Sequence, residues 1–348
     1  MRSFSKLLIL VILLALSGLS PAEKVVVFLY HRFDDDRYPS TSTSTVDLVK
    51  HIQFVRERNY EIWTLRDLVD YLSGRKDLHR TAVLFTVDDG YLTAYTKAFP
   101  IFKSFGVPFS VFLYVEGISK YPDYLTWDMA REMAEWGVEF GLHSFSHCSF
   151  PSMLNKMDEG ELEGYFRADT VKAREIFEKE LKTSALYYAY PYGHYTAVMR
   201  RVLKELGFVL AFTQDVGSLK RGYDRFTLPR EPLLEDWASV QHLEYIFTRE
   251  PLLLEEFEPS DRGIRKNTPV RIRARLLEGD KKYIRAQVYV TGKGWLEAEI
   301  NGSEVSLKDP VIVARDQTRF GIRVRSEDEK WYYRFWYVPV LDLSLIHI

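Results

Sequence analysis

Hydrophobic residues follow two alternating patterns from residue 25 to about residue 250. Short apolar runs, such as residues 25–30 and 84–87, are typical of strands buried on both faces of a parallel sheet. Between these runs, apolar residues recur at helical spacing, as Leu48, Ile52 and Val55 do. Strands that alternate with helices indicate a largely parallel sheet or barrel. We therefore predict an α/β domain of about seven or eight strands.

The same pattern places the boundaries of the elements. The expected strands cover residues 25–30, 61–63, 84–87, 109–115, 138–142, 185–190, 208–213 and 226–230. The expected helices cover residues 65–72, 94–105, 127–136, 161–181, 195–206 and 237–247, in addition to the helix that contains Leu48. Thr45, Thr64 and Thr126 precede three of these helices, where a threonine hydroxyl can accept a hydrogen bond from a free backbone N–H.

After residue 262 the helical pattern gives way to alternating apolar and polar residues. The alternating segments cover residues 270–275, 283–290, 295–300, 311–314, 319–325 and 331–338. They predict a small, sandwich-like all-β domain over residues 265–340, whose role the sequence does not indicate. Trp331, Tyr333, Phe335 and Tyr337 share one face of the last strand, and we expect this face to belong to the core rather than to a sugar-binding platform.

The first 22 residues have the order of a secretory signal. Arg2 and Lys6 precede an apolar run from Leu7 to Leu16, and small residues follow up to Ala22. We therefore predict a periplasmic or secreted protein whose mature chain begins near residue 23. The run is short for a membrane span, which needs about 20 apolar residues. The alternative is an uncleaved N-terminal segment that associates with the membrane.

The charge and the cysteine content exclude several other classes of protein. The net charge is −2 and no long basic block occurs, so we expect no nucleic acid as a partner. Cys148 is the only cysteine, so no intrachain disulfide can form and the fold must be stabilised by packing.

Two adjacent carboxylates follow the strand predicted at residues 84–87. Asp88 and Asp89 would repel each other beside a core, so their placement there is costly unless a cation holds them. A metal ion would do so. Gly90 allows the tight turn into the next helix. Taken alone, Asp-Asp-Gly is more often an ordinary turn, so the metal hypothesis depends on a second motif.

Two histidines provide that second motif. His143 and His147 lie four residues apart, directly after the strand predicted at residues 138–142. A helix or a turn can bring both imidazoles onto one ion. Two imidazoles and one carboxylate leave coordination positions open for water and substrate, as catalytic zinc sites require. The aspartate pair at another strand end favours this hypothesis over unrelated surface histidines.

The order of four motifs resembles the polysaccharide deacetylase (NodB-homology) family, carbohydrate esterase family 4. The motifs are Tyr30-His31-Arg32-Phe33, Thr86-Val87-Asp88-Asp89-Gly90, His143-Ser144-Phe145-Ser146-His147 and Tyr190-Pro191-Tyr192-Gly193. The first and the last look most like the branch that acts on exported poly-β-1,6-N-acetylglucosamine. The resemblance, which covers about residues 25 to 250, implies a distorted (β/α) barrel, one divalent metal ion, usually Zn²⁺, and removal of acetyl groups from N-acetylglucosamine units.

The resemblance also implies roles for single residues. By position, Asp89, His143 and His147 would bind the metal, and Asp88 would be the general base. The backbone N–H of Tyr192 would help to stabilise an oxyanion, which agrees with the tendency of a proline-fixed turn at a strand end to present N–H groups outward. Tyr192 would also contact the substrate.

The source of the final proton is left open. The Leu-x-x-His motif that usually supplies the general acid of the family is absent. His242 is the nearest candidate for the acid, although a role as a surface residue on a helix fits it equally well. His31 could instead line the site and contact the substrate from the end of the first strand.

A second family feature is also missing, because Ala189 occupies the usual position of an arginine two residues before the turn proline. Without a nearby cation, the pKa of Asp88 would rise and less of it would be ionised to accept a proton. We predict that Arg230, between two prolines in Leu-Pro-Arg-Glu-Pro, supplies this cation. The alternative is a surface arginine that pairs with Glu231 or Asp236.

The sequence as a whole predicts an exported, metal-dependent polysaccharide N-deacetylase. Residues 23–258 would form the deacetylase domain, and the polymer would contain N-acetylglucosamine, with poly-β-1,6-N-acetylglucosamine as the preferred candidate. One alternative is deacetylation of peptidoglycan or of chito-oligosaccharides. Another is a catalytically inactive glycan-binding protein on the same barrel, which the missing arginine keeps open.

Overall fold

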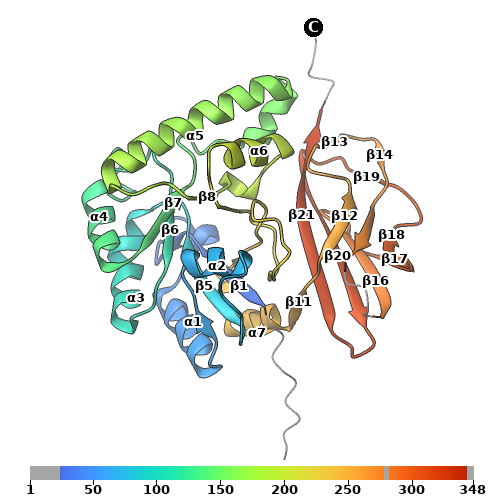
Figure 1. The fold of residues 1–348 in the computed structure, drawn as a ribbon, viewed down its shortest axis with the longest axis horizontal. Helices are drawn as coiled ribbons and strands as arrows, with labels where there is room; N and C mark the ends of the chain where they lie inside the picture. The colour runs from blue at the N-terminus through green and yellow to red at the C-terminus, as the bar shows by residue number, and fades with distance from the viewer. Residues whose placement is uncertain (1–23, 278–281, 343–348) are drawn as a thin grey trace, which may run out of the picture.

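A computed structural model describes residues 24–277 and 282–342 of the chain. Two sheets with separate hydrophobic cores lie side by side, an N-terminal sheet covered by helices and a C-terminal one built from strands alone (Figure 1). The predicted signal segment, residues 1–22, lies outside the described residues. Within the described ranges, no helix is both long enough and apolar enough to cross a membrane.

The N-terminal sheet is an open, barrel-like parallel sheet. Its strands follow the order β10-β1-β5-β6-β7-β8-β9, with β4 paired to β5. They are β1 (Val25–Tyr30), β4 (Glu61–Ile62), β5 (Ala82–Val87), β6 (Ser110–Leu113), β7 (Glu139–Leu142), β8 (Tyr187–Ala189), β9 (Leu210–Phe212) and β10 (Glu231–Pro232). The short pair β2 (Arg32–Phe33) and β3 (Ser42–Thr43) lies outside it. This arrangement confirms the predicted fold class.

Helices cover the outside of this sheet (Figure 1). They are α1 (Thr45–Glu57), α2 (Leu65–Leu72), α3 (Phe99–Phe105), α4 (Trp127–Trp136), α5 (Glu159–Leu181), α6 (Ala197–Glu205) and α7 (Val240–Thr248). Thr64 and Thr126 cap α2 and α4 as predicted, each accepting a hydrogen bond from a backbone N–H in the first turn. The cap of α1 is Ser44, not Thr45, because the Ser44 hydroxyl accepts the bond from the Asp47 N–H.

The strand predicted at residues 226–230 is wrong, because strand pairing there is limited to one bridge between Leu228 and Phe212. The strand β10 begins only at Glu231 and pairs with β1. Pro229 has no N–H to donate to a ladder, and the N–H of Arg230 donates to Asp215 O at 3.0 Å instead. Arg230 therefore lies between β9 and β10 and precedes a strand, rather than ending one.

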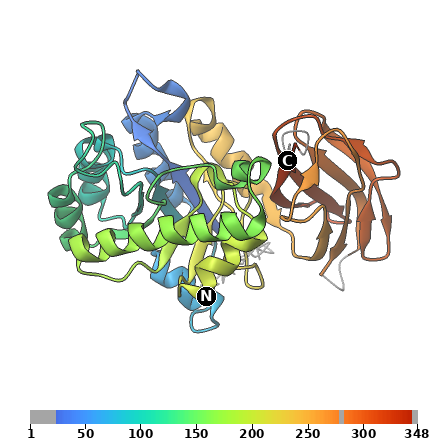
Figure 2. The same cartoon turned by 90° about the horizontal axis from the view of Figure 1, so that it is seen from above.

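The C-terminal strands form a curled, mostly antiparallel sheet around a core of their own (Figure 2). The sheet order is β11-β21-β20-β16-β17-β18-β15-β12, β13 pairs with β21, and β14 pairs with β19 in a separate two-stranded sheet. The strands are β11 (Arg249–Pro251), β12 (Leu254–Glu258), β13 (Ile264–Arg265), β14 (Pro269–Val270), β15 (Arg273–Leu276), β16 (Tyr283–Val290), β17 (Gly294–Asn301), β18 (Glu304–Ser306), β19 (Val311–Ile312), β20 (Gln317–Ser326) and β21 (Trp331–Leu341). The predicted all-β character is confirmed.

The two faces of β21 contact different parts of the molecule. Trp336 and Val338 pack in the C-terminal core, whereas Tyr337, on the opposite face, belongs to the N-terminal core. Tyr333 and Phe335 share the face of Tyr337 and lie between the two domains. The expectation that this face belongs to a core agrees with the burial of Tyr333, Phe335 and Tyr337. The core that Tyr337 joins is the N-terminal one, because alternation separates two faces without showing which neighbour each face meets.

Candidate active site

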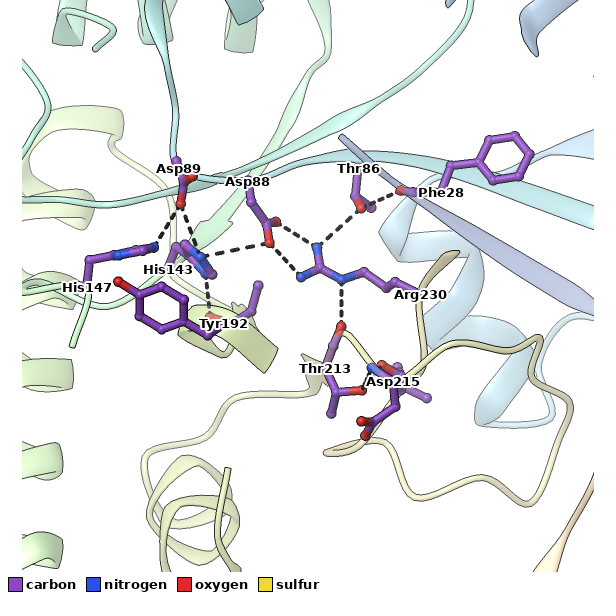
Figure 3. A network of polar contacts seen from close by, with 12 residues as sticks. Phe28, Thr86, Asp88, Asp89, His143, His147, Tyr192, Thr213, Asp215 and Arg230 are labelled. Carbon is purple, nitrogen blue, oxygen red and sulfur yellow. Dashed lines mark hydrogen bonds and ion pairs between the residues drawn. The ribbon is translucent and has the colours of Figure 1, made fainter. Parts of the chain in front are cut away.

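The carboxyl ends of three strands of the parallel sheet bring most of the predicted site residues together (Figure 3). Asp88 and Asp89 follow β5, and His143 follows β7. His147 lies in the loop after β7, and the turn that contains Tyr192 follows β8. Carboxyl ends of parallel strands meet at one edge of a barrel, and active sites gather there.

Asp89, His143 and His147 form a set that could hold a metal ion. One potential ligand atom of each lies within 4.8 Å of the others. Asp89 Oδ1 is 3.3 Å from His143 Nε2 and 3.0 Å from His147 Nε2. The partner of His143 Nδ1 is Ala189 O at 2.8 Å, which assigns the proton to Nδ1 and leaves a lone pair on Nε2. A lone pair that faces a carboxylate oxygen is favourable when a cation lies between them, so these residues fit a divalent metal.

The loop that carries the two histidines is fixed by a carboxylate outside the sequence motif. Asp169, on α5, accepts hydrogen bonds from the N–H groups of Phe145 at 2.8 Å and Ser146 at 3.0 Å. The hydroxyl of Ser144 accepts a bond of 2.7 Å from the N–H of His147. Asp169 was missed by the sequence analysis, because nothing distinguishes it from other acidic residues of that helix.

Arg230 and Asp88 form a two-pronged ion pair that is fully buried (Figure 3). The Nη1 and Nη2 groups donate to the two carboxylate oxygens at 2.6 Å each, and Nε donates to Thr213 O at 2.9 Å. Burial alone would raise the pKa of Asp88, but the charge of Arg230 contributes most to a net lowering. Arg230 is therefore no surface residue, and Glu231 pairs with Arg249 instead, at 2.6 Å.

Tyr192 lies at the edge of this cluster. Its φ of 60° and ψ of 6° place it in the left-handed region, which is strained for a residue with a side chain. Its ring is 47% exposed and lies 4.9 Å from the ring of His147. Within the described part of the chain, its N–H donates to no backbone or side-chain acceptor. That N–H is therefore free to bind another group.

The structure separates the two candidate histidines for the final proton. His31 is buried at the end of β1, where the carboxylates of Asp89 and Asp88 oppose the lowering of its pKa by burial. Its Nδ1 has no hydrogen-bond partner among residues 24–277 and 282–342. His242 lies elsewhere, at the start of α7, where its ring stacks on Trp237 at 5.9 Å. The structure brings His31 to the cluster and does not bring His242 there.

The C-terminal domain also contacts the turn that carries Tyr192. Arg319, on β20, donates through Nη2 to Tyr192 O at 3.0 Å and through Nε to Asp215 Oδ1 at 3.1 Å. Tyr337, on β21, stacks on His194 with ring centroids 4.5 Å apart. No local pattern indicates these contacts, since Arg319 is one of several arginines in segments of alternating apolar and polar residues.

Comparisons with known proteins agree with this geometry. Residues 75–211 match the family model described as polysaccharide deacetylase. The poly-beta-1,6-N-acetyl-D-glucosamine N-deacetylase of Escherichia coli is 25% identical over 261 residues, which cover 63% of this chain but only 38% of that protein. A protein of the same name from Staphylococcus epidermidis is 22% identical, over 56% of this chain and 72% of its own. The structure of IcaB from Ammonifex degensii has a TM-score of 0.54 and 27% identity, over 62% of this chain and 94% of that one.

Proposed function

Residues 75–211 form a polysaccharide deacetylase domain, and from this premise we propose that the chain hydrolyses acetamido groups on N-acetylglucosamine units of an exported polysaccharide. One observation carries the proposal: the Asp88 carboxylate, fixed and charge-compensated by Arg230, lies beside the Asp89, His143 and His147 set. The proposed general base and the proposed metal ligands thus lie together at one edge of the parallel sheet.

In the proposed reaction, Asp89, His143 and His147 hold a divalent ion, with Zn²⁺ as the preferred candidate. When bound, such an ion polarises an amide carbonyl and lowers the pKa of water. Asp88 accepts a proton from the attacking water. It is ionised and able to do so because its contact with Arg230 lowers its pKa. The water oxygen forms a bond to the amide carbon, and the carbonyl oxygen becomes an oxyanion.

Two further groups complete the reaction. The free N–H of Tyr192 donates a hydrogen bond to the oxyanion, a contribution made mainly in the transition state. The amine must gain a proton before the C–N bond breaks and acetate leaves. We assign this proton transfer to His31 rather than to His242, because His31 is the one that lies at the cluster. Arg230 keeps Asp88 ionised, in place of the arginine absent at Ala189.

Poly-β-1,6-N-acetylglucosamine is the preferred substrate, since the relatives from Escherichia coli and Staphylococcus epidermidis carry that substrate in their names. Residues 1–22 support export of the chain to the periplasm or beyond, or attachment to a membrane if they are not cleaved. The extent of the catalytic domain, residues 23–258, is part of the same proposal, and its last two strands, β11 and β12, join the C-terminal sheet.

Acetate release from defined polymers tests the proposal. The purified chain is incubated with poly-β-1,6-N-acetylglucosamine, with peptidoglycan and with chito-oligosaccharides, each with and without a chelator. We expect release from the first polymer, loss of release after chelation, and its return when Zn²⁺ is added. Faster acetate release from peptidoglycan or chito-oligosaccharides would make that glycan the substrate instead. No release from any of the three would favour a catalytically inactive glycan-binding protein.

A further inference from the structure

A cleft of about 510 Å³ separates the two domains and is lined by both of them. Gln214, Trp237 and Tyr245 contribute from the N-terminal domain, and Trp295 and Phe335 from the C-terminal domain. The volume lies within the range of ligand sites, and aromatic side chains with a few polar groups are typical of such sites. Nothing in the proposed chemistry uses this cleft.

The N-terminal wall of the cleft presents aromatic rings to solvent. Trp237 is 54% exposed and Tyr245 is 46% exposed, although both are large apolar residues that a core would accept. The ring of His242 lies almost parallel to that of Trp237, with 15° between the planes, and supports it from one side. Exposed aromatic surface held in a fixed orientation marks a binding site more often than a plain surface.

The C-terminal wall is a cluster of rings packed edge to face. The centroid of Trp295 lies 5.4 Å from that of Tyr289 and 5.5 Å from that of Phe335. The guanidinium of Arg323 lies 4.2 Å from the centroid of the Trp295 ring. These contacts fix the orientation of Trp295, so its position does not depend on a ligand. Phe335 belongs to the face of β21 that turns away from the C-terminal core.

The cleft begins beside the catalytic turn. Arg319 lines it and also donates the hydrogen bond to Tyr192 O. Gln214 lines it as well, and its backbone lies so close to Gly193 that a Cβ at Gly193 would be 2.3 Å from Gln214 N. A polymeric ligand that extended from the cluster along the Tyr192 turn would therefore enter the cleft directly.

The charges of the cleft favour a neutral ligand. Arg249 is paired with Glu231 at 2.6 Å and Arg319 with Asp215 at 3.1 Å, so the two arginines that line the cleft are already compensated. An anionic polymer would find no free cation in these two side chains. A chain of N-acetylhexosamine units is neutral and carries apolar C–H faces that suit aromatic rings and polar edges that suit side chains such as Gln214.

We propose that this cleft binds the units of the glycan chain next to the unit that is deacetylated, so that the C-terminal domain extends the substrate-binding site. The proposal rests on the proposed function and adds a ligand for a domain whose role the sequence left open. It predicts that the protein prefers long glycan substrates to short ones, because a disaccharide held at the cluster cannot also fill the cleft. The two tryptophans on facing walls should carry most of that preference.

The test compares a hexamer and a dimer of β-1,6-linked N-acetylglucosamine as substrates for the full chain and its variants. In Trp237→Ala we expect KM for the hexamer to rise about tenfold, the scale of one lost stacking contact. For the dimer we expect changes within about twofold. Trp295→Ala should give the same changes in KM. If Trp295→Ala fails to fold, Trp237→Ala alone decides the test. Tyr165→Ala removes a ring that is 50% exposed on α5, away from the cleft, and serves as the matched control.

The outcomes separate this proposal from the proposed function. If wild-type protein deacetylates both substrates and Trp237→Ala keeps the preference for the hexamer, the cleft proposal is overturned and the proposed function stands. If wild-type protein deacetylates neither substrate, binding of the hexamer, monitored by tryptophan fluorescence, tests the cleft alone. Unaltered binding by Trp237→Ala then overturns the cleft proposal. A change in oligomeric state in Trp237→Ala, measured by light scattering, would instead assign the cleft to a second copy of the chain.

Discussion

Arg319, on strand β20 of the C-terminal domain, donates a hydrogen bond of 3.0 Å to the backbone oxygen of Tyr192, the residue proposed to bind the oxyanion through its N–H. Its Nε also donates to Asp215, whose backbone oxygen accepts from the N–H of Arg230. One side chain of the C-terminal domain thus contacts both the catalytic turn and the segment that positions Arg230. The second domain is part of the support of the site.

The first prediction follows from this contact. Arg319→Ala should lower kcat on the dimer about tenfold, the scale of one hydrogen bond to a charged group, because the Tyr192 turn loses its anchor. Arg319→Lys should restore part of the loss. Arg273→Ala removes an exposed arginine that pairs with Glu258, and provides the control. Equal kcat in Arg319→Ala and in the control would limit Arg319 to holding the two domains together.

The second prediction concerns the metal ligands. Asp89→Ala or His147→Ala should abolish metal binding, because each removes one of three ligand groups and the remaining two hold an ion far less tightly. Asp88→Asn is the matched variant, and it should keep the metal while turnover falls by about 10² or more, as expected for a general base. Metal analysis and acetate release, measured on the same samples, check both statements. Full metal occupancy in Asp89→Ala would remove the ligand set.

The third prediction concerns the ion pair of Asp88. Arg230→Ala should reduce turnover at least about tenfold with the metal retained, because the carboxylate loses two hydrogen bonds and its counter-charge. A buried carboxylate without a partner also destabilises the fold, so Arg230→Lys is the safer variant. Lysine keeps the charge but cannot reproduce the two-pronged geometry, and intermediate turnover is expected. Normal turnover in Arg230→Lys and Arg230→Ala would leave Arg230 with a purely structural role.

The fourth prediction distinguishes the two candidate proton donors. His31→Gln should lower kcat by about 10² or more, because the leaving amine loses its proton source. His79→Gln changes an exposed histidine far from any proposed role and should leave kcat unaltered. Acetate release at saturating substrate is the measurement. A larger loss of kcat in His242→Gln than in His31→Gln would return the acid role to His242.

What the sequence could predict depended on how local each feature is. Asp88 and His143 directly follow apolar runs, so their position at strand ends follows from local pattern. The contacts of Asp169 and Arg319 join segments far apart in the chain, and no local pattern records them. Arg230 was expected at the end of a strand, yet it precedes one, since Pro229 ends the pairing before it.

The fifth prediction concerns stability and pH, and it rests on His51 in α1. This histidine is completely buried, with Tyr30 Oη 2.9 Å from Nδ1 and Ala238 O 2.6 Å from Nε2. Both contacts are satisfied by a neutral ring, in which the Tyr30 hydroxyl donates to Nδ1 and Nε2–H donates to Ala238. Burial lowers the pKa of His51 to about 4, a lowering that Lys50 adds to and that the Ala238 contact and Asp47 oppose.

The sign of the effect follows from proton binding. Between pH ~6.5, the usual pKa of histidine, and pH ~4, the unfolded chain binds a proton at His51 that the folded chain does not. The unfolding free energy should therefore fall as pH falls through this window, by about 2–3 kcal/mol between pH ~7 and pH ~4.5 from this residue alone. Urea unfolding at the two pH values should show this loss in wild-type protein and in His79→Gln. His51→Gln should be less stable at pH 7 but should lack this part of the pH dependence, and an unchanged pH dependence in His51→Gln would mean that His51 titrates alike in the folded and unfolded chain.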